Sequence, residues 1–151
     1  MSNMQTAAEA ARAQEVAQRT ADLLFARDQT SRGLGMKIVQ IAPGRACVSM
    51  LVRADMVNGH GSCHGGVLFS LADSAFAFAC NSYDAVTVAA AATIDFLIPA
   101  RQGDGLTAIA TELWRSRRSG VYDVAVTNQR HECVALFRGR CHQLDGKLLS
   151  D

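Results

Sequence analysis

The residues best suited to chemistry lie between Asn58 and Gly66, just before a strongly apolar segment. These nine residues include four glycines and two histidines. Where a helix begins, its first N–H groups have no partner within the helix and carry the positive end of its dipole. Glycines at such a place let an oxygen atom approach the backbone without a Cβ in the way. Gly65 and Gly66 can therefore form an oxyanion hole, in which one donor contributes about 3 kcal/mol to acyl transfer.

Asp73 is the acidic residue of the apolar segment that follows. Its neighbours there are mainly phenylalanines and alanines. An unpaired carboxylate buried among such residues costs several kcal/mol, so Asp73 needs either solvent or a function. Ser70 and Ser74 fall on the same side of a helix as Asp73, and a hydrated seam along a buried helix is the alternative interpretation.

The spacing of these groups limits how they can cooperate. Gly65 and Asp73 are eight positions apart, which corresponds to about 12 Å of rise along one helix. A reacting carbonyl needs a base and an N–H donor that are each about 3 Å away. We therefore expect each site to combine two chains, with two helices antiparallel about a two-fold axis and two equal sites per dimer.

Two other chemistries use the same loop. His60 and His64, with Cys63 and Asp73, could form a zinc site. Their spacing suits a helix, however, and the interleaved glycines interrupt one. Cys63 beside His64 could be a nucleophile, because a thiol in front of a helix start ionises more readily. Adjacent residues in an extended loop seldom point at one another, so we rank both below Asp73.

The surrounding elements follow from composition and periodicity. Residues 5–28 are rich in Ala and lack Gly and Pro, which predicts an N-terminal helix. Apolar alternation on both sides of the Pro43-Gly44 turn predicts a β-hairpin from segments 36–41 and 46–52. Residues 67–81 predict a buried helix, and four strands should follow as antiparallel sequential neighbours at 86–97, 106–117, 121–128 and 133–142. One apolar helix amid about six strands needs a sheet that curls around it, so the fold class is α+β with a wrapped sheet.

Length and charge exclude several classes of protein. The 151 residues suffice for one compact domain. Lys and Arg number 15 and Asp and Glu 14, so the net charge of +1 gives no attraction toward nucleic acid. The chain has neither a run of ~20 apolar residues nor the layout of a signal peptide, and five cysteines without paired spacing suggest reduced thiols. We expect a cytoplasmic protein with no membrane partner, and the 19% charged residues suggest a surface partly hidden between subunits.

Segments 58–66, 71–82 and 93–99 together resemble the hotdog-fold thioesterases, most closely the phenylacetic acid degradation (PaaI) type. The likeness spans about residues 33–146. It implies an N-terminal helical extension over 1–32 and a hotdog thioesterase domain over 33–151. It further implies a homodimer as the catalytic unit, assembled into a homotetramer, with no cofactor because coenzyme A is part of the substrate.

The resemblance also implies an activity and roles for individual residues. The reaction is hydrolysis of acyl-CoA thioesters, with aryl-acetyl- or hydroxyphenylacetyl-CoA of phenylacetate degradation as the substrate class. Asp73 is then the nucleophile or general base, and the Gly65 N–H of the other chain is the oxyanion donor. Asn58 positions the water or the leaving group, and His64 shapes the loop and polarises the carbonyl. The residues expected beside the substrate are Gly66, Ser74, Phe76, Thr93 and Asp95.

Two other functions fit the same resemblance. A hotdog enoyl-CoA hydratase or dehydratase would need a His and a separate carboxylate facing one β-carbon, and the sequence offers His64 but no acid besides Asp73. A non-catalytic acyl-CoA binding protein would bind its ligand without releasing free thiol. The chain has no room for an added DNA-binding module.

Overall fold

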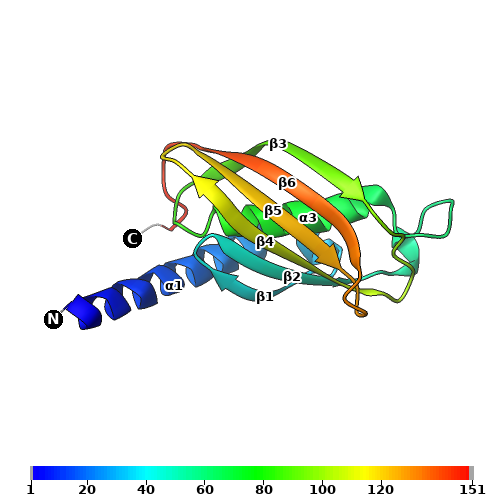
Figure 1. Cartoon of the computed structure of the whole chain (residues 1–151), viewed down its shortest axis with the longest axis horizontal. Coiled ribbons are helices and arrows are strands. Elements are labelled where there is room, and N and C mark those ends of the chain that lie inside the picture. Colours follow the sequence, from blue (N-terminus) through cyan, green and yellow to red (C-terminus); the bar gives the residue numbers. More distant parts are fainter. Residues whose placement is uncertain (1, 150–151) are drawn as a thin grey trace.

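One antiparallel sheet of six strands curls around a central helix in the computed structural model, which describes residues 2–149 (Figure 1). Two helices come first, a hairpin and a short 3-10 turn precede the central helix, and four strands follow it. The elements are α1 (Ser2–Arg27), α2 (Gln29–Gly33), β1 (Lys37–Ala42), β2 (Arg45–Leu51), η1 (Ala54–Met56), α3 (Gly65–Cys80), β3 (Thr87–Phe96), β4 (Gly105–Arg115), β5 (Ser119–Thr127) and β6 (Cys133–Gln143).

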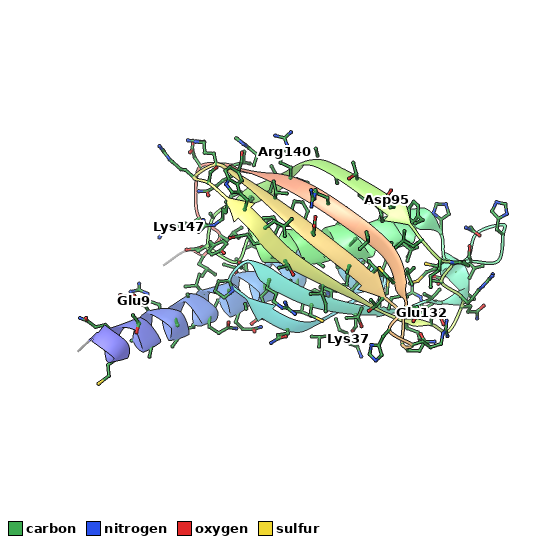
Figure 2. All side chains as sticks on the ribbon, viewed as in Figure 1. Glu9, Lys37, Asp95, Glu132, Arg140 and Lys147 are labelled. Carbon is green, nitrogen blue, oxygen red and sulfur yellow. The ribbon has the colours of Figure 1, made fainter. Side chains whose placement is uncertain are left out.

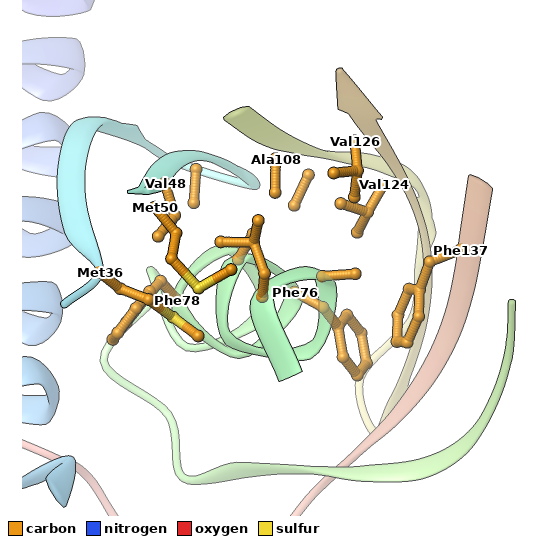
Figure 3. Packing of buried hydrophobic residues seen from close by; sticks show 14 of the residues in the cluster. Met36, Val48, Met50, Phe76, Phe78, Ala108, Val124, Val126 and Phe137 are labelled. Carbon is orange, nitrogen blue, oxygen red and sulfur yellow. The ribbon is translucent and has the colours of Figure 1, made fainter. Parts of the chain in front are cut away.

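Helix α3 forms because its apolar residues can be buried on more than one side. Along β5, buried residues alternate with half-exposed ones, and the buried ones point inward and pack on α3 (Figure 3). Phe76 lies against Phe137, with ring centroids 5.8 Å apart. An added Cβ on Gly139 would lie 2.8 Å from the Phe76 ring, so strand β6 makes room for this ring by lacking a side chain there.

The strand order β1-β2-β4-β5-β6-β3 corrects one expectation from the sequence. The hairpins β1–β2, β4–β5 and β5–β6 are confirmed. The prediction that β3 and β4 are neighbours is wrong, because β3 pairs with β6, with Ile94 opposite Phe137. Residues 97–104 do not form a hairpin turn; they pass the start of α3, where Ala100 accepts a hydrogen bond from Cys63 N at 2.8 Å. The curl of the sheet separates two strands that are consecutive in the chain.

The N-terminal segment is attached to this core at one end. The first turns of α1 project beyond the sheet, and its later turns pack on the body (Figure 1). Ala17 and Ala21 are buried, and Phe25 packs on Phe78 with ring centroids 6.2 Å apart. Asp28 then ends α1 and caps α2, accepting a hydrogen bond from Ser31 N. Among the residues that the structure describes, no helix is both long enough and apolar enough to span a bilayer.

Candidate active site

The loop before α3 is held by its own hydrogen bonds. Asn58 Oδ1 accepts from His60 N at 2.9 Å and from Ser62 N at 3.3 Å, and Asn58 N donates to Ser62 O at 2.8 Å. His64 N donates to Met56 O at 2.8 Å, which fixes the point where the helix begins. The glycine-rich loop is therefore a defined turn, and the Nδ2 group of Asn58 has no partner within residues 2–149.

The start of α3 leaves one backbone donor free. His64 is the N-cap, and its Nδ1 accepts from Gly66 N at 2.9 Å, while His64 O accepts from Val67 N and Leu68 N. The N–H of Gly65 has no partner in the described part of the chain. The expectation of a two-donor oxyanion hole is therefore corrected: His64 occupies the Gly66 donor, and Gly65 alone remains available.

A hollow of about 360 Å³ lies beside this free donor. Asn58 and Gly65 line it together with the exposed apolar segment Phe96, Leu97 and Ile98. The Phe96 ring lies against Gly65, because an added Cβ there would come within 3.0 Å of its Cζ atom. The side chain of Phe96 is nevertheless 55% exposed. The donor thus faces a mainly apolar hollow with an exposed aromatic side chain as one wall.

Asp73 lies on the stripe of α3 that the sheet leaves partly uncovered. Ser70 and Ser74 share this stripe, and each has a partner: Ser70 Oγ donates to Gly66 O at 2.8 Å, and Ser74 Oγ bonds to Ser31 Oγ at 2.8 Å. The Asp73 carboxylate has no hydrogen bond or ion pair with the described residues. Its burial raises the pKa of Asp73, and the negative charge of Asp28 raises it further. The stripe is a polar seam in which one carboxylate is half-buried and has no partner among the described residues.

The predicted residues fall into separate groups. Asn58, His64 and Gly65 lie together at the start of α3, with Gly66 next to them, whereas Asp73 and Ser74 lie about two turns further along the helix. One carbonyl group therefore cannot reach both Gly65 N and Asp73 within one chain.

Phe76 lies apart from both groups. Its side chain is 1% exposed and packs on Tyr122 with ring centroids 5.6 Å apart. In this chain it is a core residue with no surface to offer a substrate, contrary to the sequence expectation. Thr93 and Asp95 also lie apart from both groups, in the lining of a separate hollow that includes Asp123. They pair with Arg138 and Leu136 on the outer face of the sheet, away from α3; Asp95 is labelled in Figure 2.

The structure gives little support to the two other chemistries considered for this loop, a Cys63 nucleophile and a zinc site. The thiol of Cys63 is buried, which raises its pKa to about 11, so the thiol is protonated at neutral pH and a poor nucleophile. This reverses the easier ionisation expected for a thiol in front of a helix. His64 Nδ1 is already an acceptor for Gly66 N. Within residues 2–149 no three His, Cys, Asp or Glu side chains gather closely enough to hold a metal ion.

Sequence reasoning missed three side chains near these groups. Phe96 touches Gly65, and the only local signal was its place at the end of an apolar strand. Asp28 and Ser31 reach α3 next to Asp73. Their spacing is that of a helix cap, a signal that predicts the start of α2 but not what the cap contacts.

Comparison with known proteins shows which family shares this architecture. The family model of the thioesterase superfamily matches residues 60–135. The acyl-coenzyme A thioesterase PaaI of Escherichia coli is 47% identical over 131 residues, covering 87% of this chain and 94% of that protein. Its solved structure superposes with a TM-score of 0.88, covering 89% of this chain and 97% of that one.

Two further solved structures agree. The phenylacetic acid degradation protein PaaI of Thermus thermophilus, as a mutant, is 41% identical, with a TM-score of 0.75 over 78% of this chain and all (100%) of that chain. A Streptococcus mutans protein bound to acetyl CoA is 28% identical, with a TM-score of 0.71 over 74% of this chain and 90% of that chain. The sheet wrapped around α3 is thus the expected hotdog fold, and the chain belongs to the thioesterase superfamily as a thioesterase of the PaaI type.

Proposed function

We propose that this protein hydrolyses acyl-CoA thioesters, with aryl-acetyl- or hydroxyphenylacetyl-CoA of phenylacetate degradation as its substrates. One observation carries the proposal. A single helix bears an unpaired N–H at its start, on Gly65, and an unpaired half-buried carboxylate on its uncovered face, on Asp73. The names of the Escherichia coli and Thermus thermophilus relatives support the substrate class, and the acetyl CoA bound to the Streptococcus mutans protein supports the coenzyme.

The reaction follows from these two groups. The thioester oxygen accepts a hydrogen bond from Gly65 N of one subunit, which stabilises the negative charge that develops on it. Asp73 of the other subunit either attacks the carbonyl carbon, giving an acyl anhydride that water then hydrolyses, or removes a proton from the attacking water. On either route the C–S bond breaks, and coenzyme A leaves as the thiol while the acid forms. The free Nδ2 of Asn58 can donate to the water or the leaving group.

A homodimer supplies what one chain lacks. Strand β3 is an edge strand with β6 as its neighbour in the described sheet, and its residues 89–92 are all alanine. Such an edge can pair with a second copy, and an antiparallel partner would set each Asp73 opposite the other chain's Gly65. The outer face of the sheet also exposes Trp114 and Leu136, which gives two dimers an apolar surface on which to form the expected tetramer.

The test combines turnover with mixed subunits. Asp73→Asn should lower kcat for phenylacetyl-CoA by at least about 10²-fold in a free-thiol assay. Gly65→Pro removes the N–H donor, so each variant alone has no complete site. In a dimer of one chain of each kind, one of the two sites receives both wild-type groups. A randomly assorted equimolar mixture should therefore regain about a quarter of the wild-type rate.

Three results would contradict the proposal. The first is an Asp73→Asn enzyme that turns over at the wild-type rate, and the second is a mixture no more active than its separate components. The third is water addition to an enoyl-CoA without release of thiol, which would identify a hydratase instead. Unmixed samples of both variants, taken through the same subunit exchange, are the control.

A further inference from the structure

A chain of hydrogen bonds joins the N-terminal segment to the helix that carries Asp73. Asp28 Oδ1 accepts from Ser31 N at 2.9 Å, and Asp28 Oδ2 accepts from Ser31 Oγ at 2.5 Å. Ser31 Oγ in turn bonds to Ser74 Oγ at 2.8 Å. Ser31 is 0% exposed, so this connection is shielded from competing water. The start of α2 is therefore fixed on α3 at the residue that follows Asp73.

This connection holds one negative charge close to another. Among the described residues, Asp28 is the charged group that acts on Asp73, and no cation pairs with the Asp73 carboxylate. Cys80, on α3 itself, is the other titratable group that interacts with it. Two further titratable side chains face α3: Cys141 of β6 lies against Cys80, and Tyr122 of β5 donates its hydroxyl to Glu112. The other side chains that the remaining elements present to α3 are apolar. These apolar groups include Phe25 of α1, Val48 of β2, Ala108 of β4, Val124 of β5, Ile94 of β3 and Phe137 of β6.

We propose that Asp28 is a positioning residue of the thioesterase site, which acts on Asp73 through its charge and is itself held by Ser31 and Ser74. The proposal rests on the proposed role of Asp73. Two neighbouring carboxylates repel each other, so each accepts a proton more readily than it would alone. A more basic Asp73 is a better proton acceptor and a better nucleophile, provided that it is still ionised at the working pH. The N-terminal segment is then part of the catalytic apparatus.

Asp28→Asn tests this with little change of shape. Asn caps helices as well as Asp, and its oxygen can still accept from Ser31 N. The acid limb of the pH profile of kcat/KM should move to lower pH, and kcat at neutral pH should fall on the order of 2- to 5-fold, in line with Brønsted behaviour. Asp22→Asn is the matched control, because Asp22 is an exposed carboxylate of the same segment. That control should keep the wild-type profile.

A second measurement does not depend on turnover. The carboxyl carbon of Asp73 can be followed by NMR during a pH titration, in the wild type and in Asp28→Asn. The titration midpoint of Asp73 should fall in Asp28→Asn and stay unchanged in Asp22→Asn. If the role of Asp28 were merely structural, Asp28→Asn would lower Tm and leave this midpoint unchanged. An unmoved midpoint, or a moved midpoint with an unchanged acid limb, overturns the proposal. Full activity of Asp73→Asn would instead overturn the proposed function, and the titration would still decide whether Asp28 acts on Asp73.

Discussion

The free N–H of Gly65 allows a test that separates chemistry from folding. Gly65 is the first residue of α3, where proline is well tolerated because the N–H has no partner within the helix. The preceding residue, His64, has φ −59° and ψ 134°, which is the extended conformation that proline requires before it. Gly65→Pro therefore removes the donor and no hydrogen bond found in the described part of the chain. Loss of such a donor should lower kcat by about 10²- to 10³-fold, or about 3 to 4 kcal/mol.

Gly65→Ala is the matched control for this substitution. Its Cβ would lie 3.0 Å from Cζ of Phe96, so alanine brings the same Cβ contact as proline but keeps the N–H. Phe96 is largely exposed, so its ring can move aside. We expect both variants to keep a Tm near that of the wild type, and Gly65→Ala to keep a kcat within a few-fold of it in a free-thiol assay. A Gly65→Pro enzyme whose kcat equals that of Gly65→Ala would refute the role of this donor.

Two further predictions concern stability. Because the pKa of Asp73 is raised in the folded protein, the native state binds its proton more tightly than the unfolded state does, so the unfolding free energy falls as pH rises through that pKa. Asp73→Asn should thus be more stable than the wild type at neutral pH, and the difference in unfolding free energy should shrink on acidification. Denaturant-induced unfolding at several pH values measures this difference. A difference that does not change with pH would contradict the prediction. Gly139→Ala should destabilise the fold by about 1 to 3 kcal/mol, because its Cβ would lie 2.8 Å from Phe76. The double variant with Phe76→Leu should recover part of this loss, and additive losses in thermal unfolding would count against the explanation.

The sequence predicts α1, α3 and the six strands well because each depends on local pattern, but it predicts neither α2 nor η1. Alternation defines the strands to within about two residues, a margin normal for such boundaries. The sequence predicts that α3 begins at residue 67, two residues late, because Gly65 and Gly66 resemble a loop. They are helical since His64 supplies the cap through its imidazole, which is not one of the usual capping side chains.

What the sequence could not provide were contacts between residues far apart in the chain. The sequence of a strand does not show which strand pairs with it. For β3 the neighbour is β6, which lies later in the chain, and not the next strand β4. The resemblance implies that Phe76 lies beside the substrate, but the pattern of an apolar helix does not show which of its sides the sheet covers. The gap at Gly139 that accepts its ring lies on β6, in a different part of the sequence. Ser31 and Ser74 are separated by 43 positions, and neither carries a signal that it meets the other.

Part of the surface of α3, the stripe around Asp73, is left uncovered by the rest of the chain. The sheet covers the large apolar residues, and the N-terminal segment covers the side near Ser74 through Ser31. What is left is a narrow strip of small and polar residues around Asp73, too polar to be buried by the chain's own apolar groups and too narrow to hold a substrate alone. Small residues let a second helix approach closely, and a second copy of α3 would bring with it the one feature the strip lacks, a free N–H donor. On the proposed mechanism, a single chain would lack a complete site, and pairing of two chains would be the simplest way to form one.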